Sequence, residues 1–203
     1  MRWSLPLFAI LACAVPLHAQ RSAHVSARFG LAAPSEAYQS NCGHSSLAYS
    51  LDVQGTRRLF PQFSLDHLSG SGGGDVLCLP QSSLNGTTVG GLRLDGATRL
   101  GLGAGARLGT RFAQIEGAVL AGLMTGRSGY AATETENPRQ WAPHAGVQAS
   151  VVLLRHVVLS STFNWTRLSM EHRPANGAPS TTSHEWSPMA TVQLGARFRV
   201  GSD

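Results

Sequence analysis

The sequence contains no lysine and few charged residues of any kind. All sixteen basic side chains are arginine, and charged residues make up 13% of the 203 residues, against about 25% in a typical soluble domain. The arginines are scattered along the chain, whereas a nucleic-acid-binding domain gathers its basic residues on one face or one loop. The net charge of +5 therefore does not indicate a nucleic-acid partner.

Long apolar runs are also missing beyond the N-terminus. Residues 1–19 combine an apolar run from Trp3 to Val15 with a small residue at Ala19, which predicts a signal peptide cleaved at that point. An alternative interpretation makes Cys13 the lipidated first residue of a lipoprotein. The remaining sequence has no stretch near the ~18 apolar residues that a membrane helix needs. We expect one exported domain over residues 20–203.

Cysteine is scarce, with three residues in the whole chain. Removal of Cys13 with the signal peptide leaves Cys42 and Cys78. An even pair in an exported protein predicts a disulfide bond. No third partner stands at a spacing suited to a metal site, and we expect no cofactor.

The clearest positive pattern is a period of two from Leu92 to Leu123. Leucine, alanine, threonine and one glycine, Gly96, fill the even positions up to Leu108, whereas arginine, aspartate and glycine recur at the odd ones. This alternation predicts a strand with one apolar and one polar face. Gly109-Thr110 predicts a two-residue hairpin turn, which would place Ala106 opposite Ala113 and Gly103 opposite Glu116.

The same alternation recurs along the chain and predicts eight strands. These strands are 23–31, 47–54, 58–65, 92–108, 111–123, 145–153, 157–166 and 186–200. Four long connections, including 66–90, 124–142 and 171–185, alternate with three short turns, which is typical of bacterial outer-membrane barrels. Pro61 predicts a bulge or kink in the third strand, because proline removes a ladder hydrogen bond.

With this pattern the chain resembles the small eight-stranded outer-membrane barrel family that includes the OmpA transmembrane domain and OmpX. The resemblance covers residues 20–203 and implies an all-β, transmembrane, up-and-down antiparallel β-barrel. It further implies a bacterial outer-membrane location, contact with outer-membrane lipid and the barrel-insertion machinery, and a monomer. Members of this family end on an aromatic residue in the last strand, and Phe198 is the nearest candidate here.

An eight-stranded barrel has little interior space beyond what its own side chains fill. The polar face therefore predicts a lumen plugged by an ion-pair network, in which six arginines meet three carboxylates. Its predicted members are Arg28, Asp52, Arg93, Asp95, Arg99, Arg107, Glu116, Arg197 and Arg199. The alternative is a narrow anion-preferring pore lined by the same arginines.

Four aromatic residues fall near the long-loop ends of the predicted strands: Tyr49, Trp141, Trp165 and Trp186. Aromatic side chains at this level predict an interfacial belt.

Two further functions stay open as alternatives. A lipid-acting hydrolase would draw on His44, Ser45 and Ser46 or on His184-Glu185, because nucleophilic catalysis needs a serine, a histidine and a carboxylate within reach of one another. A soluble lipocalin-like carrier would have the same strand number with the apolar face inward. We expect a non-enzymatic structural or surface-interaction protein of the outer membrane.

Overall fold

The computed structural model describes residues 22–34, 46–70, 77–78, 82–84, 87–89, 92–110, 112–130, 139–174 and 181–201. The predicted signal peptide lies outside these ranges. Eight long strands dominate the described chain: β1 (Ser22–Pro34), β2 (Ser46–Gly55), β3 (Leu59–Gly70), β7 (Leu92–Gly109), β8 (Ala113–Tyr130), β9 (Arg139–Leu153), β10 (Val157–Pro174) and β11 (Thr181–Gly201). Three short strands stand between β3 and β7: β4 (Leu77–Cys78), β5 (Ser82–Leu84) and β6 (Thr87–Val89).

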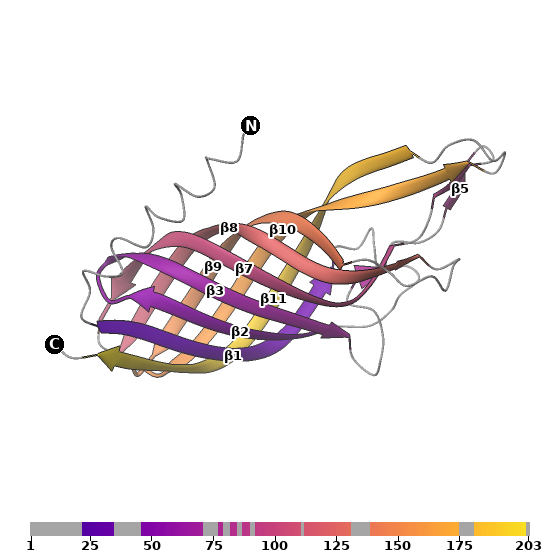
Figure 1. The fold of residues 1–203 in the computed structure, drawn as a ribbon. Coiled ribbons are helices and arrows are strands. Elements are labelled where there is room, and N and C mark those ends of the chain that lie inside the picture. Colours follow the sequence, from indigo (N-terminus) through magenta and orange to yellow (C-terminus); the bar gives the residue numbers. More distant parts are fainter. Residues whose placement is uncertain are drawn as a thin grey trace, which may run out of the picture.

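The eight long strands close into an antiparallel barrel. Each strand pairs with the next, in the order β1-β2-β3-β7-β8-β9-β10, and β11 pairs with both β10 and β1. Figure 1 shows the resulting barrel, with the C-terminal end of β11 beside the start of β1. The prediction of an all-β, eight-stranded, up-and-down barrel is confirmed. No helix in the described residues is long and apolar enough to cross a membrane.

Side chains alternate strictly between the interior and the outer surface. On β7 and β8, Leu100 is 42% exposed and Val119 is 61% exposed, whereas Arg99 and Glu116 are 2% and 3% exposed. The outer wall is therefore apolar and the lumen is charged, which is the inverse of a soluble protein. This orientation excludes a carrier with an apolar interior.

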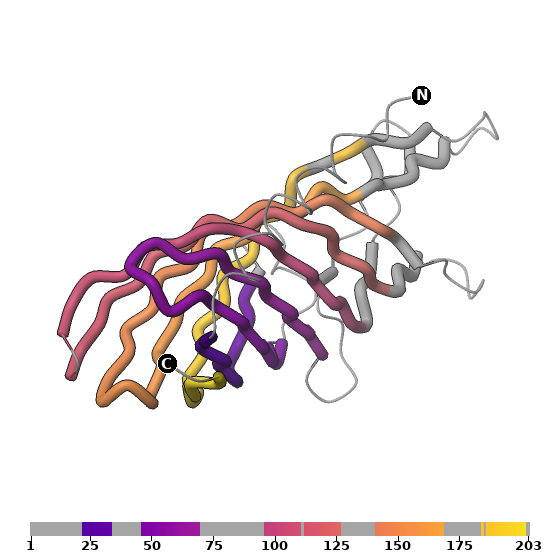
Figure 2. Tube along the Cα trace, turned by 60° about the vertical axis from the view of Figure 1, so that its left-hand side comes forward, coloured from indigo at the N-terminus to yellow at the C-terminus, as the bar shows by residue number. Residues whose placement is uncertain are grey.

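Several strands are longer than the sequence predicts. β3 begins at Leu59 instead of Arg58 and continues to Gly70, and β8 continues to Tyr130, so parts of the predicted loops are strand. β10 and β11 also pair well past the barrel rim, up to His172 opposite Thr181. The alternation of polarity weakens there, but strand pairing needs only a partner for each backbone group. In Figure 1 this hairpin extends from one end of the barrel, and Figure 2 shows the β9–β10 turn at the other end.

The β7–β8 hairpin has a different register from the predicted one. Ala106 lies opposite Gly117 instead of Ala113, and Glu116 lies opposite Arg107 instead of Gly103. The turn is wider because the Thr110 amide donates to the Ala113 carbonyl at 2.8 Å, while the Thr110 hydroxyl accepts from the Phe112 amide at 3.3 Å. A side-chain turn of this kind replaces the tight two-residue loop. Both registers put the same faces outward, so the alternation alone could not distinguish them.

The bulge expected at Pro61 is absent. Pairing of β3 with β7 runs from Leu59 to Ser69 without a shift of register. The ladder between β2 and β3 ends at Gln62, next to the proline. Pro61 thus lies beyond the end of that ladder, where a missing N–H costs no bond on that side. The one irregularity between β7 and β8 in the described register lies between Leu94 and Ala97.

A buried apolar layer lies at the long-loop end of the lumen. One inward residue from each of the eight long strands takes part, and small and large side chains both contribute. The layer consists of Ala32, Ala48, Leu68, Ala97, Met124, Ala142, Leu168 and Met189. None of these side chains is more than 7% exposed. They close the interior with hydrocarbon above the charged residues.

Replacement of Val119 with arginine tests whether the outer wall contacts lipid. Val119 lies between the short-turn end of β8 and the apolar layer at Met124, and we expect V119R to lower the free energy of unfolding in vesicles by about 2 to 4 kcal/mol. Leu108→Arg, beside the turn, should cost about 1 kcal/mol or less, because charge is tolerated near the interface. Urea titration followed by tryptophan fluorescence measures both. Equal costs at the two positions would contradict a hydrocarbon-facing wall.

Candidate functional site

The charged interior is the candidate site. Glu116 is the shared partner of two arginines and lies toward the short-turn end of the barrel. Arg197 donates two hydrogen bonds of 2.6 Å to the two carboxylate oxygens of Glu116. Arg107, the neighbour of Glu116 across β7 and β8, places its Nε 3.1 Å from Oε1. A bidentate guanidinium–carboxylate pair with a second cation beside it is a strong and directional arrangement. All three side chains are buried.

The remaining donors of these arginines also have partners. Arg197 donates to Gln54 and to Ser26, both at 3.0 Å. The Nη1 atom of Arg107 lies 2.9 Å from Nδ1 of His24. The guanidinium of Arg107 also stacks over the Phe60 ring, 4.4 Å from its centroid, in a cation–π contact.

Glycine on β7 makes room for this packing. A Cβ atom at Gly105 would lie 2.5 Å from the Phe60 ring, and one at Gly101 would lie 2.5 Å from the Ser64 hydroxyl. Both distances are too short for real carbon contacts. Gly101 and Gly105 thus leave space that side chains from β3 occupy.

A second ion pair, between Arg28 and Asp52, joins β1 and β2. Nη2 of Arg28 lies 2.6 Å from Oδ2 of Asp52, and Gln148 donates to the same oxygen at 3.4 Å. Nε and Nη1 of Arg28 and Oδ1 of Asp52 are buried without a hydrogen-bond partner among the described residues. Polar atoms of this kind usually hold water.

The third pair joins Arg99 to a residue that the sequence pattern missed. Nε of Arg99 lies 3.6 Å from Oδ2 of Asp66, and the Ser50 hydroxyl donates to the other oxygen of Asp66. Gln193 donates to Ser50 from the far side at 2.7 Å. Asp66 was missed because the predicted strand stopped at Leu65. Continuing the alternation through Gln62, Ser64, Asp66 and Leu68 would have found it.

Other members of the predicted network lie elsewhere or are not described. Arg199 is exposed at the short-turn end, where it donates to Ser22 at 3.3 Å. The backbone of Arg93 pairs with Gly129 and Cys78, but the side chains of Arg93, Asp95 and Cys78 lie outside the described part. Cys42 does as well, so the disulfide bond stays a prediction.

The predicted interfacial aromatic residues, Tyr49, Trp141, Trp165 and Trp186, are all on the outer surface. Tyr49 packs against Phe29 with ring centroids 5.2 Å apart, and Trp165 packs edge-on against Phe163 at 4.5 Å. Exposed Phe112 and Phe198 lie at the opposite, short-turn end. Aromatic side chains therefore flank the apolar wall at two levels.

The described residues offer little support for the hydrolase alternative. Ser46 is buried at the start of β2, while His184 is exposed on the hairpin beyond the rim. His44, Ser45 and the side chain of Glu185 lie outside the described part. Within the part that the structure describes, no three histidine, cysteine, aspartate or glutamate side chains are grouped as metal ligands.

The sequence matches no protein-family model and no curated protein. Among solved structures, Neisserial surface protein A is similar with a TM-score of 0.49 and 10% identity, over 87% of this chain and 94% of that one. Ail of Yersinia pestis, in complex with the heparin analogue sucrose octasulfate, gives 0.47 and 9%, over 88% and 99%. A major outer membrane protein from Thermus thermophilus gives 0.42 and 13%, over 88% and 99%. The chain is a small eight-stranded barrel. That conclusion rests on its own strand pairing.

Removal of the Glu116 charge should strongly destabilise the barrel. In Glu116→Gln, Arg107 and Arg197 stay buried without their carboxylate, and we expect a loss of about 3 to 5 kcal/mol in the free energy of unfolding. The double variant with Arg197→Gln should recover part of this loss, because it removes one of the two stranded charges. Arg199→Gln, at the exposed rim, should change stability by about 0.5 kcal/mol or less. Denaturant titration compares the three, and a cost for E116Q no larger than that of R199Q would refute the network.

Proposed function

We propose that this chain is an integral outer-membrane β-barrel with a plugged lumen, acting through its long-loop end as a structural or surface-interaction protein. The observation that carries the proposal is the inverted polarity of the wall. Leucine, valine and phenylalanine cover the outside, while three ion pairs lie inside. Exposed apolar surface of this extent is stable only when something apolar covers it. A closed barrel satisfies its backbone hydrogen bonds internally, as a lipid environment requires.

The aromatic residues support placement in a bilayer. Tyr49 and Trp141 on one side and Phe112 and Phe198 on the other bound the apolar wall. Tryptophan, tyrosine and phenylalanine at two levels are typical of the girdles of membrane barrels. Strands of 10 to 21 residues are long enough to cross a bilayer at a tilt.

The interior favours a plug over a pore. Arg197 and Glu116 bridge the lumen, and the apolar layer formed by all eight long strands lies above them. Ions would have to cross both a paired-charge layer and a hydrocarbon layer, and a narrow apolar constriction excludes water. The arginines nevertheless outnumber the carboxylates in the described lumen, and this is the observation that favours the second candidate, an anion-preferring pore.

The surface role is proposed for the hairpin of β10 and β11. Beyond Thr166 on β10 and Met189 on β11, these strands no longer pair with β9 and β1. They form a projecting ribbon to which β6 adds a strand at Pro174. A ribbon that projects beyond the rim offers contact area to molecules outside the cell.

Cell fractionation with a heat-modifiability gel tests membrane placement. We expect the mature chain in the outer-membrane fraction of a Gram-negative host, with faster migration in cold detergent than after boiling, because a closed barrel stays compact until heated. Recovery of the mature chain in the soluble periplasmic fraction would refute the proposal.

Planar-bilayer recording separates a plug from a pore. We expect the inserted chain to show no stepwise current in about 1 M salt, a concentration at which surface charge is strongly screened. Reproducible unitary currents with anion selectivity would favour the pore instead. A known porin inserted in the same membrane serves as the positive control.

A further inference from the structure

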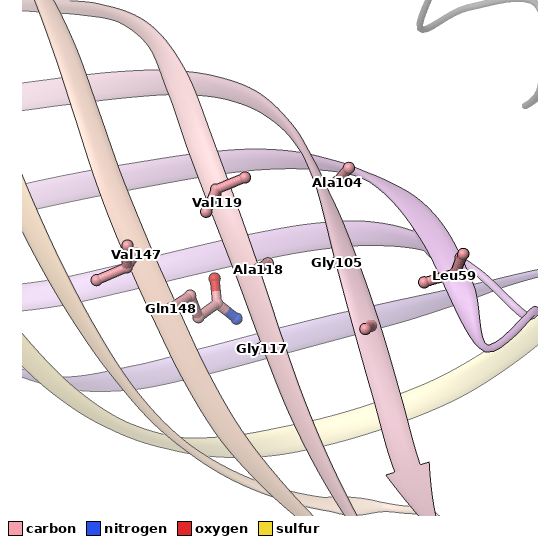
Figure 3. Close-up of a pocket in the computed structure, with 9 residues that line it drawn as sticks. Leu59, Ala104, Gly105, Gly117, Ala118, Val119, Val147 and Gln148 are labelled. Atoms are coloured by element: carbon pink, nitrogen blue, oxygen red, sulfur yellow. The ribbon is translucent and has the colours of Figure 1, made fainter.

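The outer wall contains an apolar groove that none of the preceding features uses. It is shallow and open to the outside, crosses β3, β7, β8 and β9, has a volume of about 530 Å³, and is drawn in Figure 3. Its principal lining residues are Leu59, Ala104, Ala106, Gly117, Val119 and Val147.

The groove exists because small residues sit between large ones on the lipid-facing side. Ala106 and Gly117 are direct cross-strand neighbours, and a Cβ atom at Gly117 would meet nothing within 4 Å. Ala106 and Gly117 form the bottom of the groove, and the larger side chains of Leu59, Val119 and Val147 form its sides. One end lies at Leu59, where β3 leaves its turn, and the other reaches Val147 inside β9, so the groove leads from the short-turn rim into the apolar wall.

Exposed positive charge lies in the short turns at the end of the barrel toward which the groove leads. Arg57 and Arg58 immediately precede Leu59 and are exposed, as is Arg155 in the β9–β10 turn. The Arg58 carbonyl accepts a 2.9 Å hydrogen bond from the Arg107 amide, which holds this turn beside β7. All the acidic side chains that the structure describes, Asp52, Asp66 and Glu116, are buried in the lumen. No described carboxylate therefore competes with an anionic ligand for these arginines.

We propose that the groove binds one acyl chain of an anionic glycerophospholipid whose phosphate lies against Arg57 and Arg58. The inference rests on the proposed membrane placement. An apolar groove with two exposed arginines next along the chain from its Leu59 end matches a molecule with a hydrocarbon tail and a negative headgroup. Each arginine near such a headgroup strengthens binding by about fivefold. The ligand comes from the leaflet that the short turns face.

Native mass spectrometry of the full mature chain in detergent tests the proposal, with titration of phosphatidylglycerol and, separately, of zwitterionic phosphatidylcholine. The wild type should bind its first phosphatidylglycerol molecule more tightly than its first phosphatidylcholine molecule. The Arg57→Gln/Arg58→Gln variant should weaken that binding by roughly 25-fold and leave phosphatidylcholine unchanged. Gly117→Leu should weaken the binding of both lipids, because the leucine side chain would occupy the groove without clashing with its neighbours. Arg167→Gln, an exposed arginine at the opposite end, is the matched control and should change neither.

Each other outcome has a defined meaning. Equal affinity for the two lipids, or no effect of Gly117→Leu in a variant that keeps its heat-modifiable shift, overturns the proposal. A wild-type dimer that Gly117→Leu converts to a monomer, with lipid binding unchanged, would show instead that a second copy fills the groove. Failure of the wild type to show heat-modifiability refutes the membrane placement itself, whereas a heat-modifiable barrel without lipid preference refutes this inference alone.

Discussion

The contact between Arg197 and Glu116 is the constraint on which the rest of the barrel depends. The other three salt bridges of the described residues join neighbouring strands, whereas this one connects β11 to β8 across the lumen. A buried charge is stable only when it is paired and its other donors are satisfied. Ser26, Gln54 and Arg107 supply that surrounding structure. Because side chains alternate along each strand, the same pattern that gathers these charges in the lumen gives an outer wall that is mostly apolar.

The interior is ordered in layers along the barrel axis. Phe60, Arg107 and the Glu116–Arg197 pair lie toward the short turns, the Arg28–Asp52 and Asp66–Arg99 pairs lie beyond them, and the apolar layer with Leu68 and Leu168 closes the long-loop end. Glycines on β7 give space to side chains from β3, so the volume of the lumen is shared unequally among strands. This division allows an eight-stranded barrel to hold four buried arginines. The apolar layer also reduces the access of water from the long-loop end, which strengthens the ion pairs beside it.

The two faces of each strand could be predicted from sequence because they depend on a period of two, and the strand number followed from the connections between the alternating segments. The closed architecture was implied by the resemblance to small outer-membrane barrels. Arg99, Arg107 and Arg197 share the interior with Glu116 because of the period of two. The β7–β8 register could not be predicted, since the Thr110 turn and a two-residue turn preserve the same alternation. Strand ends were missed where pairing continues through polar residues. Asp66 was therefore not recognised as an inward-facing partner of Arg99. The salt bridge between Arg107 and Glu116 depends on that register, so no pattern of residue types could have specified it.

The partition of charge separates the two ends of the barrel. Each described carboxylate forms a salt bridge with an arginine in the lumen. Arg57, Arg58 and Arg155 of the short turns therefore have no acidic neighbours among the described side chains. Exposed positive charge beside an apolar wall is favourable where lipid phosphates are present, because the guanidinium remains hydrated while its stem covers apolar surface. The long-loop end, by contrast, meets its surroundings with the tryptophans of β9 to β11 and a projecting ribbon. A barrel built in this way has two chemically distinct ends. On the proposed membrane placement, we expect the small short turns to cross the lipid during insertion and the projecting ribbon to stay on the side from which the chain inserts.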